Sequence, residues 1–176
     1  MFSRPLRTIS IRRPSGIIAG LTAAWAIFGL FLAVDSQLSV PPGTFYEIVG
    51  IIFGVSSTYA IYVGFILFMI TAVIISIIYN YVSKNVRILR ISSMPKEIGT
   101  GILAGVIVWA VLFLPMHYHV IQPALSSMVS GLNPGNLDPS IAEQLLNLSS
   151  TIIVGSLALH MLFGGVMGFC SRLAVI

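Results

Sequence analysis

Four long apolar stretches constrain this chain more than any other feature of its sequence. A helix needs about 20 mostly apolar residues to cross the roughly 30 Å hydrocarbon layer of a bilayer. Only 8% of the residues are charged, against about a quarter in soluble domains. The sequence therefore predicts an all-α integral membrane protein, a four-helix bundle. The expected spans are 16–34, 58–82, 98–118 and 151–173.

The placement of the charges predicts the orientation of these spans. The nine Lys and Arg residues lie in three places only: the N-terminal segment, the stretch 84–96, and Arg172 near the C-terminus. The two remaining connections hold four of the five acidic residues and no Lys or Arg. Because basic residues concentrate in cytoplasmic loops, we expect a multi-pass protein of the cell membrane with both termini cytoplasmic. These basic flanks account for the net charge of +4, so no nucleic-acid partner is expected.

Similar segments recur in the two halves of what we expect to be a single membrane domain, residues 1–176. Gly16-Ile-Ile-Ala-Gly-Leu opens the first expected span, and Gly101-Ile-Leu-Ala-Gly-Val opens the third. We interpret the chain as two related helical hairpins, 1–83 with the basic N-terminal segment and 98–176, in a parallel repeat. The alternative is that any two apolar helices share Gly, Ile, Ala and Val.

Both expected outer connections carry the spacing of a capping box, in which a Ser or Thr is followed three residues later by Glu. Thr44 precedes Glu47, and Ser140 precedes Glu143. We expect each pair to start a helix that runs down into the membrane. The sequence leaves open whether the outer segments 43–57 and 137–150 form a cap or a docking platform.

Pairs of Gly four residues apart predict where helices pack closely, because helix association in lipid depends on the close approach of backbones. We expect the third and fourth spans to meet at their Gly pairs. Apart from Arg172 at the inner edge of the fourth span, we expect no Asp, Glu, Lys or Arg to lie inside a span. Intramembrane charges mark proton and ion pathways, so a proton-coupled pump is disfavoured. The candidate packing residues are Gly16, Gly20, Gly50, Gly54, Gly101, Gly105, Gly164 and Gly168.

Three histidines are candidate metal ligands, because imidazole nitrogen beside methionine sulfur suits copper. His117 and His119 follow Met116, and His160 precedes Met161. However, residues two apart on an α-helix point about 200° from each other. We also expect His160 near the middle of the membrane, roughly 10–15 Å from the other two. Structural roles are therefore favoured: a helix-to-helix hydrogen bond for His160 and interfacial positions for His117 and His119.

The stretch His160-x-x-Phe163-Gly164-Gly165-x-x-Gly168, within a protein of two hairpins, resembles small four-helix membrane proteins of ammonia-oxidising archaea. Some proteins of that kind accompany the copper-dependent ammonia monooxygenase as accessory subunits. The resemblance implies a scaffolding role, with the copper chemistry in other subunits. It carries over no catalytic residue, because this sequence lacks a cluster of carboxylates and histidines.

No catalytic motif is present, and the single Cys170 has no base near it in the sequence. We therefore expect no enzyme and no cofactor. The leading hypothesis is a non-catalytic accessory or structural subunit that binds other integral membrane subunits within the lipid bilayer. One alternative is a small transporter or channel for a neutral solute, lined by Asn80, Ser156 and His160. The other is a metal- or haem-binding membrane protein that uses the histidines.

Overall fold

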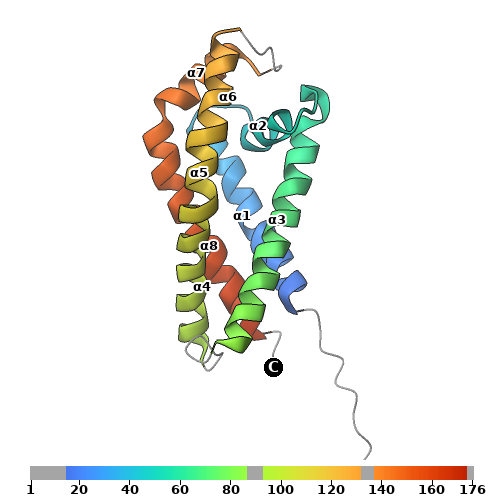
Figure 1. The fold of residues 1–176 in the computed structure, drawn as a ribbon, viewed down its shortest axis with the longest axis vertical. Helices are drawn as coiled ribbons and strands as arrows, with labels where there is room; N and C mark the ends of the chain where they lie inside the picture. The colour runs from blue at the N-terminus through green and yellow to red at the C-terminus, as the bar shows by residue number, and fades with distance from the viewer. Residues whose placement is uncertain (1–14, 87–92, 132–136, 174–176) are drawn as a thin grey trace, which may run out of the picture.

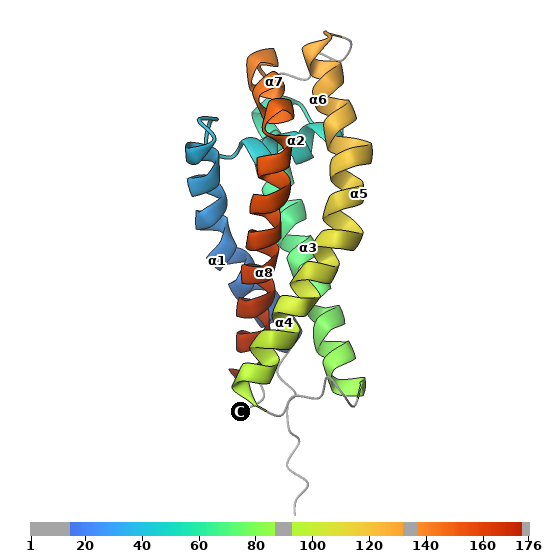
Figure 2. The same ribbon diagram turned by 90° about the vertical axis from the view of Figure 1, so that its left-hand side faces the viewer.

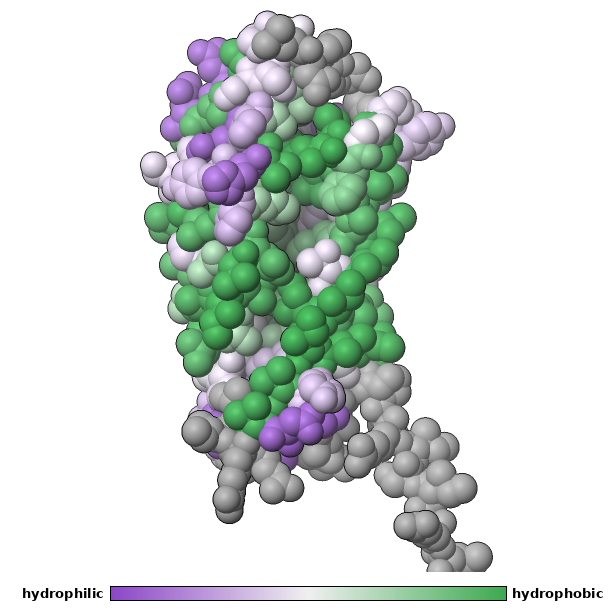
Figure 3. Space-filling view, viewed as in Figure 1, coloured by the Kyte–Doolittle hydropathy of each residue, from purple (hydrophilic) through white to green (hydrophobic). Residues whose placement is uncertain are grey.

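The computed structural model describes residues 15–86, 93–131 and 137–173, and within these ranges the chain forms helices and no strand. The part described contains four helices long and apolar enough to cross a membrane: Gly16–Gln37, Thr58–Asn85, Met94–Val129 and Ser149–Leu173. This confirms the predicted class, an all-α membrane protein with four candidate spans. The surface seen in Figure 3 is apolar over most of its height, with hydrophilic residues gathered towards the two ends.

The helices are numbered along the chain as in Figure 1. Two π-helical segments, Trp109–Phe113 and His117–Ile121, interrupt the third span. The α-helices are α1 Ser15–Gln37, α2 Thr44–Ile52, α3 Ser57–Asn85, α4 Met94–Val108, α5 Leu114–Met116, α6 Gln122–Val129, α7 Pro139–Asn147 and α8 Ser149–Leu173.

The third span is much longer than the expected 98–118, because the helix continues through two prolines. A proline inside an α-helix lacks an N–H and clashes with the carbonyl four residues earlier. Here Pro115 and Pro123 each follow a π-helical segment, at the start of α5 and α6. The wider π turn accommodates each ring, so the helix runs on to Val129.

The four spanning helices form an open arc in which α3 packs on α1, α1 on α8, and α8 on α4. The start of α1, the end of α3, the start of α4 and the end of α8 all lie at the same end of the molecule (Figures 1 and 2). At this end Tyr79 of α3 donates a hydrogen bond to Glu97 of α4. From there α3 and the α4–α6 helix diverge, so the two ends of the arc leave a recess between them.

The short helices α2 and α7 lie at the opposite end of the bundle (Figure 2). The expectation that each runs down into the following span is wrong for α2. After Ile52 the chain turns at Gly54, which has a φ of +80°, and α2 packs back along α3, with Gly50 against Ala60 and Gly64 against Tyr46. The α7 helix ends at Asn147, and α8 starts almost at once at Ser149.

Both predicted capping boxes are wrong in their cap residue. The N-cap of α2 is Gly43, in the left-handed conformation with a φ of +92°, while the Thr44 hydroxyl donates to the Pro41 carbonyl. The N-cap of α7 is Asp138, which accepts from the Ser140 N–H at 2.9 Å. At the start of both helices a backbone N–H donates to an acidic side chain that precedes the helix. The acceptor is Asp138 for α7, and for α2 it is Asp35, which accepts from the N–H of Gly43.

The tightest interface in the bundle joins α4 to α8 through glycine. A Cβ atom at Gly101 would collide with the backbone carbonyl of Gly164, and one at Gly105 with the carbonyl of His160. A Cβ at Gly164 or Gly168 would likewise meet the backbone of α4. The two helices therefore touch backbone to backbone over about two turns.

Gly164 and Gly165 provide a matched test of this interface, because only Gly164 faces α4 backbone. We predict that Gly164→Ala lowers the stability of the protein by about 1–3 kcal/mol, the usual cost of overpacking. A Cβ at Gly165 would meet only the Ile102 side chain at 3.4 Å, so Gly165→Ala should be nearly neutral. Thermal unfolding in detergent, followed by circular dichroism, measures both variants, and equal losses would contradict the assignment.

Candidate functional site

A cavity of about 510 Å³ fills the recess between the two ends of the arc. Its walls come from α1, α2, α3, α8 and the long third span. The hollow between α3 and the α4–α6 helix is visible in Figure 3. The lining is almost wholly apolar and rich in Phe, and its polar side chains are Tyr46, Thr71 and His160.

His160 is the histidine that faces this cavity. Its Nδ1 atom lies 2.7 Å from the Ser156 carbonyl of the same helix, so the bond runs within α8 and not to a neighbouring helix as expected. A carbonyl oxygen can only accept, so Nδ1 carries the proton, and in the neutral ring Nε2 is an acceptor. The ring also packs against Phe113, with centroids 5.6 Å apart.

Tyr46 is the polar residue of α2 that lines the cavity. Its ring lies among four phenylalanine rings of α1 and α3, at centroid distances of 5.6–6.0 Å. The side chain is only 4% exposed, and its hydroxyl has no hydrogen-bond partner. Burial raises the pKa of Tyr46 above its ordinary value, so the hydroxyl keeps its proton.

The other two histidines have separate surroundings. His117 is buried, against expectation, and its Nε2 lies 2.9 Å from the Ser149 hydroxyl. Gln122 donates to the same hydroxyl at 2.6 Å, so the three side chains join the third span to the start of α8. His119 is exposed, as expected for an interfacial residue.

The structure does not assemble a metal site from these residues. Within the described ranges, no group of three or more His, Cys, Asp or Glu side chains could hold a metal ion. A haem would bring two carboxylates, and the cavity lining contains no Lys or Arg to pair with them. Of the three residues that the transport hypothesis placed along one path, His160 lies in the cavity lining, and Asn80 and Ser156 do not.

Asn80 and Ser156 connect helices instead. Asn80 donates from α3 to the Ser171 hydroxyl of α8 at 2.9 Å, and Trp109 donates to Ser156 at the same distance. Both are interhelical hydrogen bonds of the kind that stabilise membrane bundles.

Two buried carboxyl groups lie near the ends of the spans, where no acidic residue was expected. Glu97 of α4 is fully buried, and its carboxyl group accepts a hydrogen bond of 3.2 Å from the Tyr79 hydroxyl of α3. Asp35 is fully buried at the other end of the bundle and accepts from Gly43 at 2.7 Å. The expectation is wrong because α1 continues beyond residue 34 and α4 starts before residue 98. The sequence signal that could have predicted a partner for Asp35 is the Pro41-Pro42-Gly43 turn that follows it, because this turn brings the N–H of Gly43 to the Asp35 side chain.

The remaining glycines have different surroundings. Gly16 and Gly20 face the backbone of α3, and Gly50 faces Ala60. Gly54 was expected to pack against a helix, but it lies in the turn after α2 with no atom within 4 Å of its Cβ position. Gly64, which was not singled out, faces the backbone of α2.

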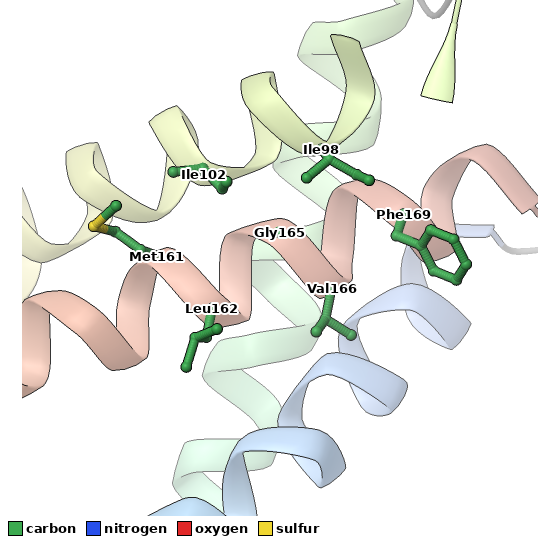
Figure 4. A pocket seen from close by; sticks show the side chains of 7 residues that line it. All are labelled: Ile98, Ile102, Met161, Leu162, Gly165, Val166 and Phe169. Carbon is green, nitrogen blue, oxygen red and sulfur yellow. The ribbon is translucent and has the colours of Figure 1, made fainter. Parts of the chain in front are cut away.

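A second, shallower hollow of about 310 Å³ lies along the α4 and α8 surface. Figure 4 shows Ile98 and Ile102 on α4 beside Gly165 of α8, which has no side chain, and the other lining residues, Met161, Leu162, Val166 and Phe169, along α8. Because its side chains are apolar, this hollow offers contact with lipid and no chemistry.

Comparison of the chain with protein families, curated proteins and solved structures found no match. The class of the protein is therefore the one that its fold defines, a helical membrane protein with four candidate spans in the described residues.

The Asp35 side chain gives a testable prediction, because it is the acceptor for the buried N–H of Gly43. Asp35→Ala leaves this donor without a partner, which should cost about 1–3 kcal/mol. Asp35→Asn keeps an acceptor oxygen of the same shape and should cost clearly less. Thermal unfolding measures both, with Ser36→Ala as the exposed control on the same helix. A loss as large in the Asn variant as in the Ala variant would refute this role of the acceptor.

Proposed function

We propose that this chain is a non-catalytic subunit that binds other integral membrane proteins through the outward face of α1. The supporting observation is a seam of small residues on that face, exposed along the helix: Thr22, Ala26, Gly29 and Ala33. Their spacing of four, three and four residues places them on one side of the helix. Within this chain no atom lies within 4 Å of a Cβ built at Gly29.

The chain's own interfaces support this interpretation of the seam. Small residues let helix backbones approach closely in lipid. Within this chain, Gly20, Gly101 and Gly164 lie where two helices touch. The seam on α1 also consists of small residues, with Gly29 among them, and it is exposed on the outside of the bundle. A partner helix could approach the α1 backbone most closely at Gly29, where no Cβ intervenes.

The partner to test first follows from the resemblance carried by His160, Phe163, Gly164, Gly165 and Gly168. Accessory proteins of that type accompany a copper-dependent ammonia monooxygenase, and we propose such an assembly as the setting for this subunit.

A bulky residue in the seam tests the proposal. Gly29→Leu should displace a partner helix at a cost of about 1–3 kcal/mol, which corresponds to roughly a 5- to 150-fold loss of affinity. On native gels of mildly solubilised membranes, the variant should run as a smaller species than the parent. Ala110→Leu, an exposed small-to-large change on the third span, is the matched control. An unchanged complex in the Gly29 variant would refute the proposal.

We further infer that both termini face the cytoplasm and that the two halves, 1–83 and 98–176, arose as a parallel repeat. The basic flanks support the orientation. The matching Gly16–Gly20 and Gly101–Gly105 pairs support the repeat, since each pair faces the second spanning helix of its own half.

Labelling of intact cells tests the orientation. In a Cys170→Ser background, cysteine is introduced either as Ser130→Cys or as Asn85→Cys, two exposed residues at opposite ends of the bundle. A membrane-impermeant maleimide should label the first variant and reach the second only after lysis. The reverse pattern would show that the protein has the opposite topology.

A further inference from the structure

The cavity between α3 and the third span has the size of a small-molecule site. Its volume of about 510 Å³ lies within the range of about 300–1,000 Å³ that is usual for small-molecule pockets. Five parts of the bundle contribute to its walls: α1, α2, α3, α8 and the third span. A small molecule is therefore the occupant to test. This site is separate from the α1 seam of the proposed function.

The lining excludes a charged occupant. No Lys, Arg, Asp or Glu contributes to it, and an unpaired charge in such surroundings is costly to bury. A fatty-acid carboxylate or a phospholipid headgroup would therefore be a poor ligand. The walls instead present many aromatic rings, among them Phe31, Phe45, Phe53, Phe68, Phe113 and Phe163, which suit a flat aromatic ring.

His160 defines the hydrogen bonding that a ligand must offer. Since Nδ1 of His160 donates to the Ser156 carbonyl, its Nε2 atom needs a donor, and no described residue supplies one. The other two polar side chains of the lining offer less, because the Tyr46 hydroxyl is fully buried and the Thr71 hydroxyl already donates to the Leu67 carbonyl. A ligand with an O–H group matches His160, whereas a ligand that only accepts does not.

We propose that this cavity binds an uncharged amphiphile with a phenol-type head and an apolar chain. The phenol hydroxyl donates to Nε2 of His160, and its ring packs among the phenylalanines. The apolar chain leaves sideways between α3 and α5, where the arc is open to the bilayer. The ligand class includes alkylphenols and quinols.

A pair of probes that differ by one hydrogen-bond donor tests the proposal on the full-length protein in phosphatidylcholine nanodiscs. 4-Octylphenol has the hydroxyl donor, and 4-octylanisole, its methyl ether, lacks it. Binding is measured at equilibrium, with the uptake by empty nanodiscs subtracted. One hydrogen bond contributes about 1 kcal/mol, so the phenol should bind about fivefold more tightly than the ether.

Variants of His160 assign the preference to its side chain. His160→Phe keeps a ring of similar size and removes the acceptor, so phenol and ether should bind equally. His160→Gln retains an acceptor oxygen and should keep part of the preference. His119→Phe, at the exposed histidine outside the cavity lining, should keep all of it. Circular dichroism on each variant establishes that it is folded.

Three outcomes would overturn the proposal: equal binding of phenol and ether by the parent, an undiminished preference in His160→Phe, or saturable binding of palmitate with none of the phenol. The parent comparison needs no variant, so it holds even if a substitution at His160 prevents folding. Native-gel migration is measured separately, so failure of this proposal and failure of the α1 docking surface are distinguishable.

Discussion

Backbone contact between α4 and α8 is the interaction on which the rest of this structure depends. Apolar side chains gain no free energy by moving from lipid to a helix interface, so helices in a bilayer are held together by close packing and hydrogen bonds. Here Gly101 and Gly105 meet Gly164 and the carbonyl of His160 without intervening side chains. Because the α8 backbone is held at this point, His160 occupies a defined place in the bundle. Its side chain then projects into the cavity, while its main chain forms part of the interface.

The same packing explains why the bundle is open. Small residues in α1 face α3, so α1 can approach it closely, and α8 joins α1 to α4. Between α3 and the third span, the residues that face each other above Tyr79 are large and apolar, among them Phe68 and Leu112. Such side chains hold the helices apart, and the cavity is the space that remains.

Local signals in the sequence predicted the four spans well, because hydropathy is a property of consecutive residues. The spans' ends were predicted less well: Asp35 and Glu97 would be costly to bury alone, yet Gly43 and Tyr79 supply their hydrogen bonds. The continuation through Pro115 and Pro123 depends on π turns that hydropathy does not register. The cavity could not be predicted, because it lies between helices that are distant in sequence. His160 was recognised as a candidate, but its role as an acceptor follows from the Ser156 bond.

The hydrogen bond between Tyr79 and Glu97 joins α3 to α4 at one end of the bundle, and the cavity lies between α3 and the third span farther along. Because the arc is open on this side, an apolar molecule dissolved in the bilayer reaches the cavity without passing through water. The concentration of an occupant in the lipid, and not its concentration in the aqueous phase, then sets how often the cavity is filled.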